Sequence, residues 1–275
     1  MEATPVDALV DAAGRRHLAY SAVPRIVSLV PSITELVCTL GLSGALVGRT
    51  GFCIHPRAAL REVPKLGGTK NVDLGKLRSL EPTHVILNID ENPREMAEAI
   101  AAIGAEIIVT HPLAPIDNIA LYRLLGGIFR REAEAERLAE TYRERYDKIS
   151  LAFRDARRIN TLYLIWKSPW MTVSRDTYIS RTLALVALDT VPLMTAERYP
   201  KIDIEHAARE ADLVLLASEP YSFRDKDVAA LRELPAMESK RAALIDGEMT
   251  SWYGPRAIAG LDYLAALRTR LDRQL

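Results

Sequence analysis

Cysteine is scarce in this chain. The 275 residues contain two cysteines, Cys38 and Cys53, which form neither a CxxC pair nor a cluster with ligand spacing. A disulfide framework needs more cysteines, and a structural zinc site needs them at short, regular spacing. We therefore expect no metal site of the chain's own and no cofactor, and the cysteines leave the redox compartment open.

Long apolar runs and an excess of one charge are also missing. No stretch approaches the ~20 apolar residues that cross a bilayer, and residues 1–16 lack the apolar core of a signal peptide. Lys plus Arg and Asp plus Glu both total 36, and no basic face stands out. We expect a soluble chain that does not bind nucleic acid.

Catalytic motifs are absent as well. The five histidines are scattered without an HExxH pair, and the chain has no GxSxG, Walker A or GxGxxG segment. His84 begins an apolar run and is expected to be structural, whereas His55 and His111 lie in loops and could ligate iron or cobalt. We expect no catalytic residues and a protein that is not an enzyme.

The chain has the composition of a two-domain α/β protein. Its 49% hydrophobic residues can bury a sizeable core, and its length suits two domains of about 100 to 150 residues. Apolar runs alternate with helical stretches, which predicts lobes with mainly parallel sheets. The expected strands are 25–30, 45–49, 84–89 and 106–110 in the first half, and 161–166, 212–217 and 242–246 in the second.

The segment 117–157 interrupts this alternation. It lacks proline, is rich in Ala, Glu, Arg and Leu, and is predicted to be helical with a break at Gly126 and Gly127. Residues 131–157 could form one helix of ~40 Å. We therefore expect an N-terminal lobe over 1–125, a connecting backbone helix over 126–158 and a C-terminal lobe over 159–275. A capping box, Ser32 with Glu35, is expected to start the first helix.

The loops that follow the strands are the expected ligand site, because ligands of open α/β sheets gather outside the carboxyl ends of the strands. All three tryptophans, Trp166, Trp170 and Trp252, fall in such loops of the second lobe. Exposed aromatic side chains suit flat or bulky organic ligands. The alternative is that they fill the ends of their own lobe's core. We favour a pocket wall, because three core residues would not all need loop positions.

Arg256 lies near an expected helix start, where Pro255 suits an early helical position. Its guanidinium could bind a ligand carboxylate through a forked contact. The alternative is an ion pair with a neighbouring acid such as Glu248. The sequence leaves both roles open.

Three segments carry a family resemblance that extends over about residues 10 to 272. Residues 10–15, 24–35 and 72–86 read VDAAGR, PRIVSLVPSITE and VDLGKLRSLEPTHVI. Together they resemble the substrate-binding proteins of ABC importers for cobalamin, haem and iron siderophores. The resemblance implies a class III periplasmic binding protein fold, in which a long helix joins two α/β lobes and the ligand binds between them.

The resemblance also implies particular site residues. Phe52, Trp170 and Tyr199 match aromatic residues that line the family's pocket, and Glu248 falls near an acidic residue that contacts ligand. His55 or Tyr253 could contact the metal of a bound chelate. The complete set of expected ligand-binding residues is Phe52, His55, Trp166, Trp170, Tyr199, Glu248, Trp252, Tyr253 and Arg256.

A permease and a bulky ligand are the partners that the family implies. Glu205 matches a glutamate that docks on the permease, while Gly75 stands where the other is expected, and Asp73 is the acid proposed to substitute for it. The expected ligand is cobalamin or a related corrinoid, with haem, an iron siderophore or another bulky organic molecule as alternatives. We expect a periplasmic monomer. A cytoplasmic tetrapyrrole- or metal-handling protein on the same fold is the alternative from another class.

Overall fold

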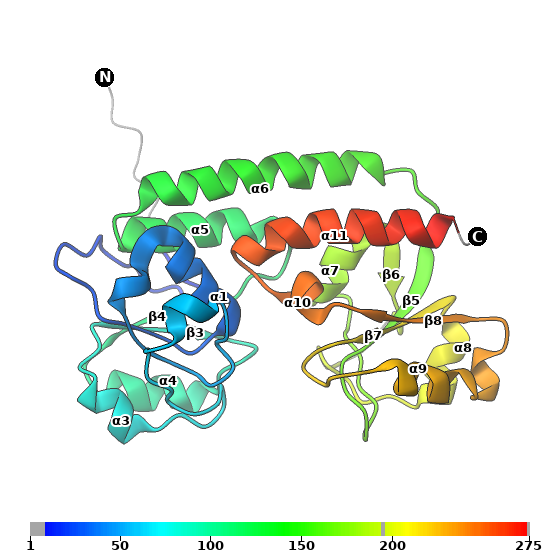
Figure 1. Cartoon of the computed structure of the whole chain (residues 1–275), viewed down its shortest axis with the longest axis horizontal. Helices are drawn as coiled ribbons and strands as arrows, with labels where there is room; N and C mark the ends of the chain where they lie inside the picture. Colours follow the sequence, from blue (N-terminus) through cyan, green and yellow to red (C-terminus); the bar gives the residue numbers. More distant parts are fainter. Residues whose placement is uncertain (1–8, 194–195, 274–275) are drawn as a thin grey trace. The chain divides into compact units, whose positions relative to one another are not determined.

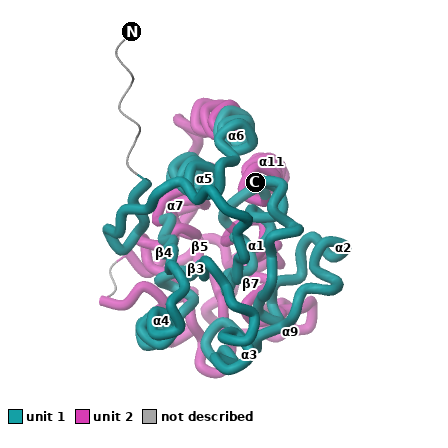
Figure 2. Tube along the Cα trace, turned by 90° about the vertical axis from the view of Figure 1, so that its left-hand side faces the viewer, with its two compact units in different colours: residues 1–112, 117–141, 253–255 teal, residues 113–116, 142–252, 256–275 magenta. Residues whose placement is uncertain are grey.

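The computed structural model describes residues 9–193 and 196–273 and divides the chain into two compact units. Unit 1 takes residues up to 112, then 117–141 and 253–255, and unit 2 takes 113–116, 142–252 and the residues from 256 onward (Figure 2). Both units consist of parallel strands and helices, so the predicted α/β fold class is confirmed. The domain limits at 125 and 158, and a ligand site between lobes, stay predictions.

Unit 1 is built on a four-stranded parallel sheet in the order β2-β1-β3-β4. Figure 1 labels two of its strands, β3 and β4. Its strands are β1 (Ile26–Ser28), β2 (Leu46–Arg49), β3 (His84–Asn88) and β4 (Glu106–Thr110). Its helices are α1 (Pro31–Val37), α2 (Arg57–Leu60), α3 (Leu74–Ser79), α4 (Arg94–Ala101) and α5 (Asp117–Ile128). One face of the sheet packs Val27, Leu87 and Ile107 against Leu77 and Ile100, which come from α3 and α4.

Unit 2 is built on a second four-stranded parallel sheet, in the order β6-β5-β7-β8. Its strands are β5 (Ile159–Leu164), β6 (Leu188–Thr190), β7 (Leu213–Ala217) and β8 (Arg241–Ile245). Its helices are α7 (Tyr178–Ala184), α8 (Ile204–Glu210), α9 (Asp225–Arg232), α10 (Gly247–Ser251) and α11 (Pro255–Asp272). Pro255, the first residue of α11, is assigned to unit 1, and the rest of the helix is assigned to unit 2. Every residue of β7 is buried, as expected of a central parallel strand covered on both faces.

Helix α6 (Glu132–Ala152) belongs to both units, because residues up to 141 lie in unit 1 and those from 142 lie in unit 2. The break before it differs from the prediction. Gly126 and Gly127 lie inside α5, and the turn comes at Arg130, which has φ 54°. A Cβ on Gly126 would collide with the Cβ of Ala135 in α6. The glycine therefore permits close packing of two helices and does not end one.

The predicted capping box at Ser32 is wrong. Helix α1 starts one residue earlier, at Pro31, with Val30 as a cap that makes no side-chain hydrogen bond. Proline suits the first helical position, because its missing N–H has no intrahelical acceptor there. Ser32 is consequently inside the first turn, and its buried hydroxyl has no hydrogen-bond partner among the described residues.

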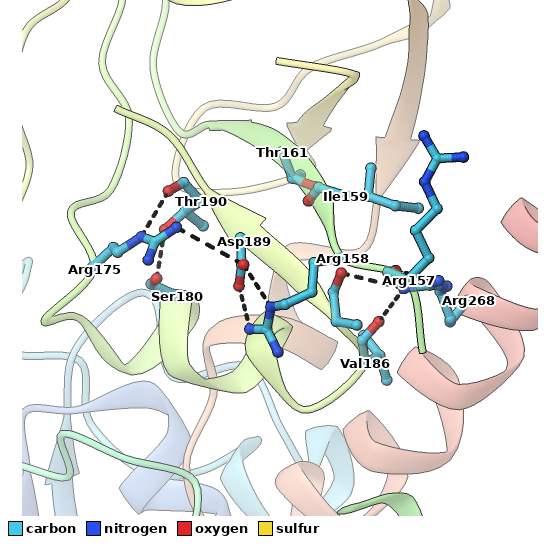
Figure 3. Close-up of polar contacts among 11 residues, drawn as sticks. Arg157, Arg158, Ile159, Thr161, Arg175, Ser180, Val186, Asp189, Thr190 and Arg268 are labelled. Atoms are coloured by element: carbon cyan, nitrogen blue, oxygen red, sulfur yellow. Dashed lines mark hydrogen bonds and ion pairs between the residues drawn. The ribbon is translucent and has the colours of Figure 1, made fainter. Parts of the chain in front are cut away.

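Polar contacts close the amino end of the second sheet, where β5 and β6 begin (Figure 3). The Arg158 guanidinium pairs with Asp189 of β6, and this contact holds the pKa of the Asp189 carboxyl below its usual range. Arg268 of α11 is 2% exposed and donates to the carbonyls of Val186 and Arg157. These bonds fix α11 against the backbone that leads into β5 and β6. Among the described residues, no helix combines the length and apolarity needed to span a membrane.

Candidate ligand-binding site

The loops after β5, β7 and β8 meet at one edge of the second sheet, because the carboxyl ends of parallel strands share an edge. Backbone hydrogen bonds join these loops to one another. The Tyr221 amide donates to the Ile165 carbonyl at 3.3 Å, and the Ser218 amide donates to the Ile245 carbonyl at 3.0 Å. Main-chain hydrogen bonds therefore hold the three loops of this edge together.

Four aromatic rings form a connected cluster along this edge. Trp166 meets Tyr221 edge to face at 5.6 Å between ring centroids, and Tyr221 lies 4.6 Å from Phe223. Trp170 stacks on the other side of the cluster, 6.0 Å from Phe223 with an interplanar angle of 5°. Phe223 is buried, whereas Trp166 is 40% exposed. The cluster therefore joins the hydrophobic core of unit 2 to an indole that reaches solvent.

Lys167 anchors the loop between the two tryptophans. Its ammonium donates to Asp227 of α9 at 2.7 Å and lies 5.7 Å from the centre of the Trp170 ring. The Lys167 contact holds the pKa of the Asp227 carboxyl below its usual range. Because Asp227 is buried, this pair fixes the loop more firmly than a surface pair would.

A second cluster on the same edge surrounds Glu219. The indole N–H of Trp252 donates to the Glu219 carboxyl at 2.5 Å, and the Ser251 hydroxyl donates to it at 3.3 Å. Burial raises the pKa of Glu219 to about 7, opposed by these two donors and assisted by the negative charges of Glu248 and Asp246. Glu219 is consequently a carboxyl group that changes charge near neutral pH.

Gly247 allows the loop after β8 to pass close to the loop after β7. A Cβ at this position would lie 2.6 Å from Cγ and 2.9 Å from the backbone nitrogen of Glu219. Its amide also donates to the Ser218 hydroxyl at 2.9 Å. Any side chain here would separate the two loops and with them the contact between Glu219 and Trp252.

Arg256 forms the ion pair with Glu248 that the sequence offers as one of its two roles, and the ligand contact stays a prediction. Its guanidinium lies 3.1 Å from the Glu248 carboxylate and 5.0 Å from the centre of the Trp252 ring. Helix α11 begins at Pro255, as predicted. Trp252 is 8% exposed, so it is held between Glu219 and Arg256 with little surface left for a ligand.

Unit 1 contributes three of the expected residues. Phe52 follows β2 and is 63% exposed, with Gly68 leaving room beside its ring. His55 lies in the same loop and is half-buried. Tyr253 is 6% exposed and belongs to the short segment 253–255 of unit 1. Phe52 is the most accessible aromatic among the expected site residues of the chain.

The remaining expected residues lie at helix starts and in a loop. Tyr199 is half-buried, and the Arg198 guanidinium lies 6.0 Å from the centre of its ring. Glu205 lies in the first turn of α8, where its carboxylate accepts a hydrogen bond from the Ala236 amide at 3.2 Å. Asp73 caps α3 by accepting from the Lys76 amide at 2.9 Å. Both acids therefore have structural contacts in addition to any docking role.

A family model described as periplasmic binding protein matches residues 26–248, which is most of the chain. The chain belongs to this family. The resemblance seen in the sequence is thus confirmed, and the family is one of solute-binding proteins.

Individual relatives are distant but cover most of this periplasmic binding protein. The vitamin B12-binding protein of Vibrio parahaemolyticus is 22% identical over 243 residues, 88% of each chain. Among solved structures, the periplasmic vitamin B12 binding protein of Vibrio cholerae has a TM-score of 0.77 at 17% identity, covering 90% of this chain and 96% of that one. A periplasmic heme binding protein from Pseudomonas aeruginosa has a TM-score of 0.76 at 22% identity, covering 89% and 92%. The structural likenesses establish the fold.

The structure of this periplasmic binding protein groups five of the expected ligand-binding residues in two sets within unit 2. Trp166 and Trp170 share one aromatic cluster, and Trp252, Arg256 and Glu248 share the contacts around Glu219. Reasoning from sequence missed Tyr221, Phe223 and Glu219 as individual site residues. Their signal is their position, because residues 218–223 directly follow the buried strand β7. Among the described residues, no group of three or more His, Cys, Asp or Glu is arranged to hold a metal ion.

Proposed function

We propose that this periplasmic binding protein captures a bulky tetrapyrrole-type ligand, cobalamin or a related corrinoid, and delivers it to the permease of an ABC importer. The observation that carries the proposal is the aromatic cluster whose outer ring, Trp166, is 40% exposed. The name of a relative supports it, because the Vibrio parahaemolyticus relative quoted above is a vitamin B12-binding protein. The task needs no covalent chemistry, only binding and release.

The aromatic cluster suits such a ligand for physical reasons. Indole and phenol rings bring a large apolar area with few rotatable bonds, so little side-chain entropy is lost when a ligand binds. Trp166 is backed by Tyr221, and Tyr221 is backed by the buried Phe223. A ligand that covers Trp166 therefore contacts a surface whose orientation is already fixed.

Haem is the second candidate, favoured by a different observation. His55 is half-buried in the loop that carries the exposed Phe52, and imidazole is a common axial ligand of haem iron. Periplasmic heme binding proteins are also among the structures with the same fold. A haem ligated by His55 would give a Soret band that shifts when His55 is changed to Ala. A corrinoid site centred on Trp166 would be unaffected by that change.

The test is a titration of the purified protein with cobalamin, cobinamide, haem and several iron siderophores, followed by tryptophan fluorescence and by calorimetry. Trp166→Ala retains Trp170 and Trp252 as fluorescent reporters. We expect one ligand class to quench saturably, and Trp166→Ala to weaken its binding by about a hundredfold, as for a well-packed aromatic hot spot. Leu151→Ala is the matched control, because Leu151 is 65% exposed on α6.

Unchanged affinity in Trp166→Ala, with its melting temperature preserved, would remove the aromatic cluster from the binding site. Absence of both heat and quenching with every ligand would overturn the proposed ligand class.

Docking on the permease is proposed for Glu205 and Asp73. The informative variants keep the local hydrogen bonds and remove the charge. Glu205→Gln can still accept from the Ala236 amide, and Asp73→Ser can still cap α3. We expect both to bind ligand normally and to support slower importer-dependent uptake. Normal uptake by both variants would exclude the two acids as docking contacts.

A further inference from the structure

A pocket that is chemically different from the aromatic cluster of unit 2 lies in unit 1, beside the end of β2. It has a volume of about 250 Å³, and four of its lining side chains are the cations Arg49, Arg57, Arg61 and Lys65. None of the described residues that line it is acidic. A concave surface with four positive side chains and no negative one attracts anions.

Arg49 is the buried member of this set. It is 7% exposed, and its terminal nitrogens donate to three backbone carbonyls, those of Thr50, Cys53 and Leu60, at 2.9 to 3.2 Å. Its Nε is buried and has no hydrogen-bond partner among the described residues. Among the described residues, the guanidinium therefore hydrogen-bonds only to neutral carbonyls and has no ion pair, although a buried charge is normally compensated by an opposite charge.

The other buried arginine of the protein shows what compensation looks like. Arg268 of unit 2 is 2% exposed and donates to carbonyls of Val186, Ala187 and Arg157, much as Arg49 does. Its Nε, however, donates to the Asp272 carboxylate at 2.8 Å. Within the described part of the chain, the Nε of Arg49 has no hydrogen-bond acceptor such as the carboxylate that Arg268 has.

The exposed cations of the pocket add like charges at close spacing. Arg57 begins α2, and Arg61 follows four residues later on the same helical face. The carboxylate nearest to Arg61 belongs to Glu62, at 3.6 Å between side chains that are 84% and 91% exposed, so it is strongly screened. Lys76 does not line the pocket, but its ammonium lies close to the Lys65 backbone, where it donates to the Lys65 carbonyl at 2.8 Å. Repulsion among these groups would be relieved by a bound anion.

We propose that this pocket binds a small oxyanion, a phosphate or carboxylate group, with Arg49 at its base and Arg57, Arg61 and Lys65 around its mouth. Guanidinium groups match both chemistries, because their planar N–H donors pair with two oxygens at once. The pocket is also lined by Gly51 and Cys53, which belong to the loop of Phe52. Anion binding therefore links α2 to the loop that carries the most exposed aromatic of unit 1.

The experiment measures binding of inorganic phosphate and of citrate to the full chain by calorimetry and by thermal unfolding, at constant ionic strength with chloride as the reference salt. We expect saturable binding of at least one oxyanion and a rise in melting temperature beyond that in chloride. The stronger of the two probes identifies the group that the pocket prefers. Equal effects of phosphate, citrate and chloride would overturn the proposal.

The decisive variant is Arg57→Gln with Arg61→Gln, because both side chains are exposed and neither carries a packing role. Loss of two charged hydrogen bonds should weaken oxyanion binding by about tenfold or more. Arg143→Gln with Lys148→Gln removes the same charge from exposed positions of α6 and should leave the affinity unchanged. Equal weakening by both double variants would mean that net charge attracts the anion, and would sink the pocket proposal.

Arg49→Lys tests the base of the pocket. It keeps the charge and removes the guanidinium fork, so oxyanion affinity should fall while the fold persists. If this variant unfolds, the Arg57 and Arg61 double variant still decides the question. Unchanged affinity in folded Arg49→Lys would remove Arg49 from the site.

Discussion

The two units have sheets of the same topology, but the loops at the carboxyl edges of the two sheets carry different residues. In each, the first strand of the unit lies second in the sheet, next to the second strand on one side and the third on the other. The loop residues at the carboxyl ends differ completely. Unit 2 carries linked aromatic rings and the half-buried carboxyl of Glu219, whereas unit 1 carries the exposed Phe52 and a basic pocket lined by its neighbours Gly51 and Cys53. The comparison teaches that strand alternation fixes the topology while the loops decide the chemistry.

The aromatic residues of the two edges should behave differently when removed. Phe223 is 3% exposed beneath Trp170 and Tyr221, so Phe223→Ala should lower the free energy of unfolding by about 3 to 5 kcal/mol. Phe52 is 63% exposed, so Phe52→Ala should change it by less than about 0.5 kcal/mol. Urea denaturation measures both. Equal losses would break the contrast between a core-linked edge and a solvent-exposed one.

The half-buried carboxyl of Glu219 in unit 2 should make stability depend on pH. The pKa of Glu219 is about 7 in the folded protein against an ordinary 4.5, so the folded state holds more protons than the unfolded state between these values. Stability must then fall as pH rises from 4.5 through 7. Glu219→Gln should be more stable than the parent at pH 8, on the order of 2 kcal/mol, and equal to it near pH 5.

Denaturation curves at several pH values check this dependence. Glu144→Gln, on the exposed face of α6, is the control and should leave the pH dependence of the parent protein intact. A Glu219→Gln variant that retains the parent's loss of stability between pH 5 and 8 would assign that loss to other groups.

The smallest expected difference between the units is in the stability that each loses when an ion pair is broken. Lys167→Gln leaves the buried Asp227 without its cation and should cost about 2 kcal/mol. Arg123→Gln breaks a 2.6 Å pair with Glu136 whose side chains are 54% and 46% exposed, and should cost no more than about 0.5 kcal/mol. Repeating both measurements in 1 M salt sharpens the contrast, because the Arg123 effect should vanish and the Lys167 effect should persist.

The ion pair between Lys167 and Asp227 predicts that stability also depends on pH in the acidic range. The pKa of Asp227 is lowered in the folded state, chiefly by Lys167. Its contribution to stability is therefore present above the unfolded pKa and is lost as pH falls through the folded value. Lys167→Gln should consequently lose less stability than the parent on acidification, and a parallel loss would exclude this pair as its source.

Much of the fold could be predicted because each long strand is a continuous apolar run. The expected strand over 106–110 matches β4, and that over 212–217 differs from β7 by one residue. The short β6 was missed because three residues, Leu188–Thr190, give no periodicity. The break expected at Gly126 was placed wrongly, since a glycine that permits helix packing has the same sequence signature as one that ends a helix.

The candidate site was predictable in its position and less so in its members. The tryptophan loops were found from the order of strands and loops, but burial distinguishes the three tryptophans, from 8% exposed for Trp252 to 40% for Trp166. Glu219 was missed because an acidic residue in a loop is ordinarily solvated. Its indole partner comes from a loop 33 residues further along the chain.

The sequence by itself determined the parallel α/β class of the fold and the largely helical character of the segment that contains α5 and α6, and it predicted the loops that carry the candidate site. These features depend on local apolar periodicity and strand order, which are written along the chain. The tertiary structure decided which side chains meet: Trp252 with Glu219, Tyr221 with Trp166, and Arg49 with carbonyls alone. Such contacts join residues far apart in sequence, and their burial sets the charge and exposure of each group.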